Sequence, residues 1–266
     1  MKMLTTLLLL ASLTAQAATP VSVPEDFALS AEVVNGERWG WWEKSLIVTL
    51  PEPIRVLSSN EGFVQALAVV NHAAHPLLWV KAFEELGSEA SSGGDVYLSE
   101  VEERLSTARA VTQAQLALTA TAADMDNLAV ATERSGPFVV TALVTAGARS
   151  NAHRAGTDMG TNIEAAGTVN VILLLNAQLT DGAQTNAVIM ATEAKTAAFQ
   201  DLSVPSSYTP SVLATGTGTD TVIVVPSSTG PEVTYAGGHA VIGGLIARAT
   251  HRAVKQALIK QNGFSE

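Results

Sequence analysis

Apolar and polar positions in the first part of the chain alternate in short runs typical of β-strands. Three such runs cover residues 30–34, 39–42 and 46–50, and proline follows the last of them at positions 51 and 53. The first two runs are separated by Asn35-Gly36, and Asn-Gly between apolar runs is a strong hairpin signal. We therefore predict an antiparallel meander over residues 29–57 that turns at Asn35-Gly36 and has a strand that ends before Pro51.

The remainder of the chain mixes strand and helix patterns. Further strands are predicted over residues 116–121, 128–132, 138–145, 167–176 and up to 225, and helices over about 99–111, 180–200 and 240–258. The Ser99 and Glu102 pair has the spacing of a capping box, and Thr180 is suited to begin the next helix. Because the strands and helices follow no regular βαβ rhythm, we expect an α+β or mixed-sheet α/β fold: a single domain at 18–266, with a central mixed β-sheet flanked by helices.

The first seventeen residues have the features of a secretory signal peptide. Lys2 gives a positive start, residues 4–13 are mostly apolar, and Ala15-Gln16-Ala17 matches a small-x-small cleavage site. We expect cleavage after Ala17, export across the inner membrane and a periplasmic location.

Composition narrows the choice of partners. The formal net charge is −10 and no basic cluster occurs, which argues against nucleic acid as a partner. The 266-residue chain has no cysteine, so it forms neither disulfides nor thiolate metal sites. No stretch reaches the roughly 20 continuous apolar residues of a membrane span. The oligomeric state is not indicated by the sequence.

A glycine-threonine loop precedes the strand that ends at Val225. It contains Thr215, Gly216, Thr217, Gly218 and Asp220. A phosphate-binding loop would carry a lysine and open a helix, whereas this loop enters a strand. The glycines permit unusual backbone angles and the polar side chains can serve acyl transfer, with Asp220 or a threonine as the reacting group. The alternative is a turn in which Asp220 caps backbone groups.

Other polar residues extend this candidate site. His239 follows two glycines at a helix start, where it either acts as a base or caps the helix. Asn151 and Arg154 lie in a polar loop, which is either solvated or binds an anionic or amide-bearing ligand. His72 and His75 lack a third ligand of comparable spacing, and we expect no metal site there.

Several motifs occur together in one order along the chain. They are Val144-Thr-Ala-Gly-Ala-Arg-Ser-Asn-Ala-His-Arg-Ala-Gly156, Gly167-Thr-Val-Asn-Val-Ile-Leu-Leu-Leu-Asn176, Ala191-Thr-Glu-Ala-Lys-Thr-Ala-Ala198, Ala214-Thr-Gly-Thr-Gly-Thr-Asp220 and Tyr235-Ala-Gly-Gly-His239. In residues, order and spacing the chain resembles the adenosylcobinamide amidohydrolase family. The resemblance is strong over about 138–258 and weaker before that.

The resemblance implies an enzyme of cobamide salvage that binds a corrinoid. It would cleave the aminopropanol amide of adenosylcobinamide to give adenosylcobyric acid and 1-amino-2-propanol, and the cobalt would arrive with the substrate, so no separate cofactor or metal is expected. The implied catalytic residues are Asp220, His239, Thr217 and Thr215, and the implied substrate-binding residues are Asn151, Arg154, Asn170, Glu193, Lys195, Gly216 and Gly218.

Three features separate this chain from the family pattern, and the largest is the expected export, because the later enzymes of the pathway that the resemblance implies are cytoplasmic. Ala240-Val241 stands where a Thr-Lys pair is expected, and Thr157 is an extra residue in its loop. Glu193 and Lys195 are about 200° apart around a helix and cannot both face one pocket.

The departures from the family pattern leave an alternative interpretation, which is an exported corrinoid-binding or scavenging protein without catalysis.

Overall fold

The computed structural model describes residues 18–27, 29–87, 93–160 and 165–265, and this part of the chain folds as one α+β domain. Its α-helices are α1 (Pro76–Leu86), α2 (Gly93–Arg109), α3 (Asp181–Asp201) and α4 (Val241–Asn262). The main sheet contains β1 (Ala18–Pro20), β2 (Ser30–Arg38), β3 (Trp41–Ser58), β4 (Gly62–Ala74), β5 (Leu116–Thr121), β6 (Ala129–Ser135), β7 (Phe138–Ala146), β9 (Val169–Leu175) and β12 (Thr221–Val225).

Shorter elements complete the described chain. The strands β8 (Ala152–His153) and β11 (Gly216–Thr217) form one pair, and β10 (Gln178–Leu179) and β13 (Glu232–Val233) form another. Three 3₁₀ turns cover Glu25–Phe27, Gln113–Gln115 and Met125–Asn127. No helix among the described residues is long and apolar enough to cross a membrane.

The long strand β3 joins the two halves of the sheet. It pairs with β2 and β4 along its first half, and with β12 and β4 near its end. The register with β4 shifts between Thr49 and Ile54, and Pro51 and Pro53 lie within that shift. Prolines are tolerated at such irregularities because no ladder hydrogen bond is lost there. The prediction that the strand ends at Pro51 was therefore wrong.

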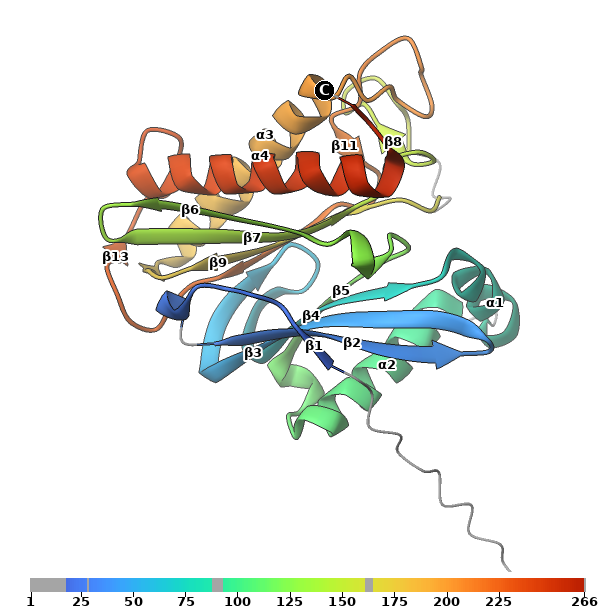
Figure 1. Ribbon diagram of the computed structural model, residues 1–266, viewed down its shortest axis with the longest axis horizontal. Coiled ribbons are helices and arrows are strands. Elements are labelled where there is room, and N and C mark those ends of the chain that lie inside the picture. The colour runs from blue at the N-terminus through green and yellow to red at the C-terminus, as the bar shows by residue number, and fades with distance from the viewer. Residues whose placement is uncertain (1–17, 28, 88–92, 161–164, 266) are drawn as a thin grey trace, which may run out of the picture.

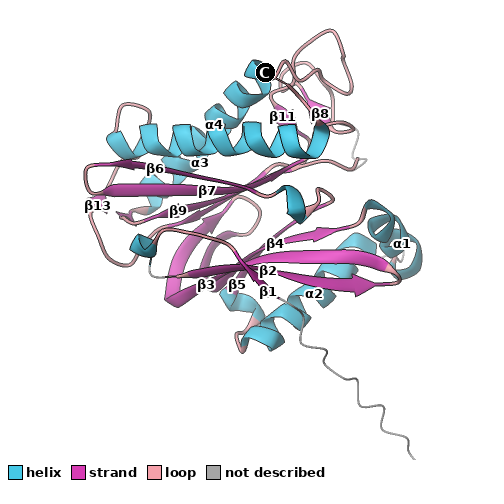
Figure 2. Ribbon diagram, in the orientation of Figure 1, coloured by secondary structure: helices cyan, strands magenta, loops and turns pink. Residues whose placement is uncertain are grey.

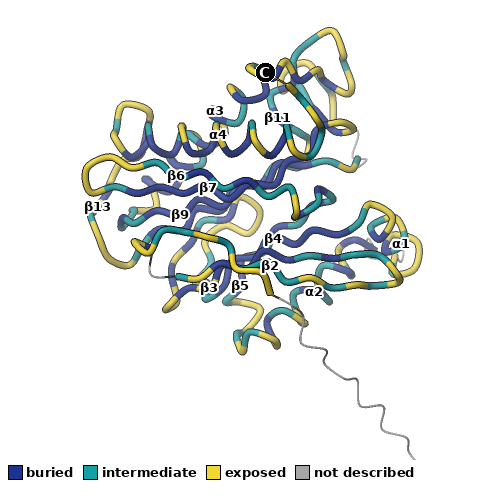
Figure 3. The backbone as a smooth tube through the Cα atoms, in the orientation of Figure 1, coloured by how far each residue is buried: buried dark blue, intermediate teal, exposed yellow. Residues whose placement is uncertain are grey.

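The sheet curls so that its halves face each other across an apolar core. One half holds β1 to β5 with α1 and α2 outside it, and the other holds β6, β7, β9 and β12 with α3 and α4 outside it (Figure 1, Figure 2). Side chains from both halves meet in the middle, among them Leu46, Val69, Leu143, Ile172 and Ile223. The strands of this core are dark blue, meaning buried, in Figure 3. The predicted mixed sheet flanked by helices is confirmed.

Helix α4 packs on the outer face of β6 and β7, and α3 packs on β12 and on α4, through small and aliphatic side chains. The buried stripe of α3 is alanine at positions 183, 187, 191, 194 and 198, which recurs about every turn. Helix α4 buries Ile242, Leu245, Ile246, Ala249 and Ala253, as its sequence pattern predicts. Alanine stripes let two helices lie close to the sheet and to each other.

Two local predictions were wrong. Asn35-Gly36 lies inside β2, and the hairpin turns at Trp39 and Gly40, whose φ angles are 53° and 82°. Two positive φ values fit the tight turn that matches sheet twist, and the nine-residue pairing of β2 with β3 outweighs the local preference of Asn-Gly. Helix α2 is already formed at Gly93, so Ser99 is an interior residue of that helix and does not cap it.

Candidate functional site

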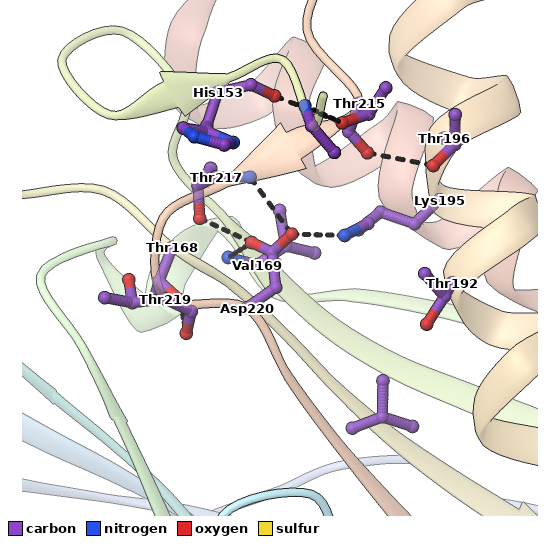
Figure 4. Close-up of polar contacts among 12 residues, drawn as sticks. His153, Thr168, Val169, Thr192, Lys195, Thr196, Thr215, Thr217, Thr219 and Asp220 are labelled. Atoms are coloured by element: carbon purple, nitrogen blue, oxygen red, sulfur yellow. Dashed lines mark hydrogen bonds and ion pairs between the residues drawn. The ribbon is translucent and has the colours of Figure 1, made fainter. Parts of the chain in front are cut away.

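The carboxylate of Asp220 lies just before β12 and accepts hydrogen bonds on both oxygens (Figure 4). Oδ1 accepts from the Val169 N–H at 3.0 Å and from the Thr217 hydroxyl. Oδ2 accepts from the Thr217 N–H at 3.0 Å and forms an ion pair with Nζ of Lys195. The Asp220 and Lys195 side chains are only 13% and 12% exposed. The site is therefore a largely buried ion pair with added backbone and hydroxyl donors.

Neighbouring elements bring this pair together. Strands β9 and β12 are parallel, and Thr221 pairs with Asn170, so the residues that precede the two strands lie side by side. Lys195 comes from α3, the helix over these strands. The loop before Asp220 is tied to α3 by the Thr196 hydroxyl, which donates to the Thr215 carbonyl at 2.9 Å. Asp220 and Lys195 are thus held by a sheet end and a helix.

Close packing explains the two glycines of the loop. Neither Gly216 nor Gly218 has a positive φ, so the prediction that they supply unusual backbone angles was wrong. A Cβ on Gly216 would collide with the carboxylate of Asp220 and the ammonium of Lys195. A Cβ on Gly218 would lie 2.9 Å from Oδ1 of Asn151. The glycines allow charged and amide side chains to cross the loop backbone.

A cleft of about 630 Å³ opens beside Asp220. Its polar lining includes Asn60, Thr119, Thr121, Thr168, Thr219, Asp220 and Thr221. Its apolar lining includes Trp79, Val80 and Phe83 of α1, and Val80 and Phe83 are about half exposed. The cleft falls within the size range of small-molecule sites, and its half-exposed apolar rim suits a ligand larger than the cleft itself.

Asn170 holds the wall of this cleft from inside. It is fully buried, and its amide donates to Oδ1 of Asn71 at 3.0 Å and to the Ala120 carbonyl at 2.8 Å. Asn71 in turn donates to the Thr145 hydroxyl at 2.8 Å. The chain of bonds joins β9, β4, β5 and β7, and a buried network whose polar groups are paired makes such a wall rigid. Asn71 is a part of it that sequence reasoning did not identify.

The candidate residues Asn151, Arg154 and Thr215 bind neighbouring loops. Asn151 is 3% exposed, donates to the Gly167 carbonyl at 2.8 Å and accepts from the Tyr208 hydroxyl at 2.7 Å. The Arg154 guanidinium donates to the Leu213 carbonyl at 3.2 Å. The Thr215 hydroxyl accepts from the Ala155 N–H at 3.0 Å. Each of these side chains fixes the loops that surround Asp220.

The structure does not bring His239 to Asp220. The Asp220 carboxylate accepts from the first residue of β9, whereas the His239 ring packs on Tyr235, with ring centroids 5.0 Å apart, and Gly238 before it lies against Met190 of α3. Helix α4 starts after His239 and ends at the Asp220 side, where Asn262 accepts from the Ala148 N–H at 2.8 Å. Its 22 residues span about 33 Å. The described contacts of Asp220 do not include His239, and a catalytic role for His239 remains untested.

Lys195 is the partner that takes this place, since its ammonium meets Asp220. Glu193 is exposed on α3, which agrees with the expectation that Glu193 and Lys195 cannot share one pocket. The earlier histidines have structural contacts: His72 is buried between Ser45 and Tyr97, and His75 caps α1. Within the described ranges, no group of three or more His, Asp or Glu side chains is placed to hold a metal ion.

Fold and site together define an α+β protein with a buried lysine–aspartate pair in the wall of a cleft. A family model described as adenosylcobinamide amidohydrolase matches residues 30–266. The chain therefore belongs to the adenosylcobinamide amidohydrolase family, a family of hydrolases that act on an amide.

Two individual proteins are similar to the chain. The uncharacterized protein MJ1613 of Methanocaldococcus jannaschii is 39% identical over 236 residues, which is 82% of this chain and 87% of that protein. The crystal structure of the PH0078 protein from Pyrococcus horikoshii has a TM-score of 0.40 and 12% identity, and the match covers 82% of this chain and 76% of that one.

Proposed function

We propose that the protein hydrolyses the aminopropanol amide of adenosylcobinamide, giving adenosylcobyric acid and 1-amino-2-propanol. The observation that carries this proposal is Asp220, which lines the cleft of a chain from this family and is paired with Lys195. Amide hydrolysis needs a base for the attacking water and an acid for the leaving nitrogen. The Asp220 carboxylate can serve as the base and, once protonated, as the acid, and the Lys195 ammonium stabilises its charge.

Asp220 is assigned as the group that meets the substrate because it lines the cleft, whereas neither Thr217 nor Lys195 is among the cleft-lining residues. In the proposed reaction, water attacks the amide carbon and its proton passes to Asp220. The carbon–nitrogen bond then breaks as Asp220 passes this proton to the departing nitrogen. Asp220 is again a carboxylate paired with the Lys195 ammonium after one water has been consumed.

Thr217 is proposed as a positioning residue, since its hydroxyl and N–H both hold the Asp220 carboxylate. Thr217→Val removes the hydroxyl contact but leaves the N–H, and we expect turnover to fall about tenfold. If the Thr217 hydroxyl were the nucleophile, Thr217→Val would instead abolish turnover. The wild type would then form a covalent acyl-enzyme that mass spectrometry of the intact protein detects.

A corrinoid-binding protein without catalysis is the second candidate, and the departure from the family pattern at Ala240-Val241 favours it.

We also propose export to the periplasm, on the pattern of residues 1–17, which lie outside the described residues. Sequencing the N-terminus of the protein recovered from a periplasmic fraction tests export, with Ala18 expected first.

The test of function is to incubate the mature protein with adenosylcobinamide and measure the mass of the corrinoid. Conversion to adenosylcobyric acid by the wild type, and its loss in Asp220→Asn, supports the proposal. A spectral change on binding with unchanged mass would support the binding protein instead.

A further inference from the structure

Thr119 of β5 carries a polar atom that the proposed reaction does not use. The residue lines the cleft and is 2% exposed, and its hydroxyl is buried without a hydrogen-bond partner in the part of the chain that the structure describes. The next threonine on the same face of β5 differs, because the Thr121 hydroxyl accepts from the Ala123 N–H at 2.9 Å.

An unpartnered buried hydroxyl lowers stability, because it loses its bonds to water and gains none in return. Valine has nearly the same shape, favours strands and would remove that cost. A threonine at this position is therefore unfavourable for folding alone. A ligand that fills the cleft and hydrogen-bonds the Thr119 hydroxyl would satisfy this hydroxyl and would account for a threonine at this position.

The surroundings of Thr119 indicate what kind of group would bind it. Thr119 pairs in register with Asn71, whose amide is already engaged by Thr145 and Asn170. Asn60, also in the cleft wall, donates to the Thr221 hydroxyl at 3.2 Å. Among the described cleft-lining residues there is no lysine, arginine or histidine, and the charged residues are the carboxylates of Asp95 and Asp220, which disfavour an anionic group. Such a wall suits a neutral group that both donates and accepts hydrogen bonds.

We propose that the Thr119 hydroxyl hydrogen-bonds a neutral side-chain amide of the corrinoid, which makes Thr119 a substrate-binding residue. The proposal rests on the proposed function, because it takes the corrinoid as the ligand of the cleft. An amide on the edge of the ring accepts through its oxygen and donates through its nitrogen, so it can satisfy the hydroxyl in either direction.

The experiment compares Thr119→Val with Thr119→Ser and with a matched control, Thr250→Val. Thr250 in α4 is also fully buried with an unpartnered hydroxyl, and it does not line the cleft. Both valine variants should melt at the same temperature as the wild type or higher. Thr119→Val alone should raise KM for adenosylcobinamide three- to tenfold, with kcat within twofold, and Thr119→Ser should restore KM.

A second substrate distinguishes the ring amide from the leaving group. In an analogue whose amide carries propylamine in place of 1-amino-2-propanol, the KM ratio of Thr119→Val to wild type should be unchanged. A ratio that falls to one would place the hydroxyl against the leaving group and overturn the assignment. Unchanged KM in Thr119→Val, with a wild type that is active, would overturn the proposal alone. A wild type that neither binds nor hydrolyses cobinamide would overturn the function as well.

Discussion

The ion pair of Asp220 and Lys195 makes the most demanding prediction about this molecule. Asp220→Asn keeps one acceptor oxygen, which can accept from the Val169 N–H or from the Thr217 N–H but not from both, and it leaves the Lys195 ammonium, 12% exposed, without its counter-ion. Removing one partner of a buried ion pair costs about 3 kcal/mol of unfolding free energy. Lys195→Met leaves the carboxylate with its hydroxyl and N–H donors, so about 2 kcal/mol is expected. Because the two changes remove one shared interaction, the double variant should lose at least about 1.5 kcal/mol less than their sum.

Urea unfolding of the mature protein, followed by circular dichroism, measures this coupling. The matched control is the exposed pair of Arg55 and Asp181, whose side chains are 47% and 57% exposed. Arg55→Met and Asp181→Asn should couple by less than about 0.5 kcal/mol. A coupling between Asp220 and Lys195 as small as that of the control would refute the reasoning that the pair is buried and paired in solution.

Three further predictions concern other residues. His239→Ala should keep turnover within twofold, because His239 is not among the contacts of Asp220. A tenfold loss of turnover in a steady-state assay would contradict a site built without His239. Gly216→Ala should lower turnover at least tenfold and also lower the melting temperature, since the methyl group displaces Asp220 and Lys195; activity equal to wild type would be contrary to this packing. Burial lowers the pKa of His72 from 6.5 to about 4. As the pH falls, the unfolded chain therefore binds a proton at this residue before the folded protein does. The free energy of unfolding should fall by about 3 kcal/mol between pH 6.5 and pH 4. In His72→Gln, urea unfolding at several pH values should show a shallower fall, and an equal slope would exclude His72 as its source.

Local patterns were enough to predict the elements of the second half of the chain. The apolar runs that form β7 and β9, the Thr180 cap of α3 and the stripe of α4 all depend on neighbouring residues, and the structure confirms them. The hairpin turn was missed because its position is decided by the register between β2 and β3. That register depends on which faces become buried in the curled sheet, and no short motif records it.

The loop was identified from sequence as the candidate site, and the alternative of Asp220 as a cap for backbone groups also holds, since it accepts from two N–H groups. Its partner was not predictable. Lys195 is on a different element, and the sequence placed it among the substrate-binding residues and not beside Asp220. The network of Asn71 and Asn170 joins residues 99 positions apart in sequence, and such contacts follow from topology alone.

The role proposed for Asp220, with Lys195 behind it, is the hydrolysis of a corrinoid amide in the cleft. The most direct measurement is the release of 1-amino-2-propanol from adenosylcobinamide by the wild type, Asp220→Asn and His239→Ala, at equal concentrations of folded protein. We predict one aminopropanol for each adenosylcobyric acid formed by the wild type and His239→Ala, and a rate at least a thousandfold lower for Asp220→Asn, about 4 kcal/mol of barrier. Release by Asp220→Asn at the wild-type rate would contradict it.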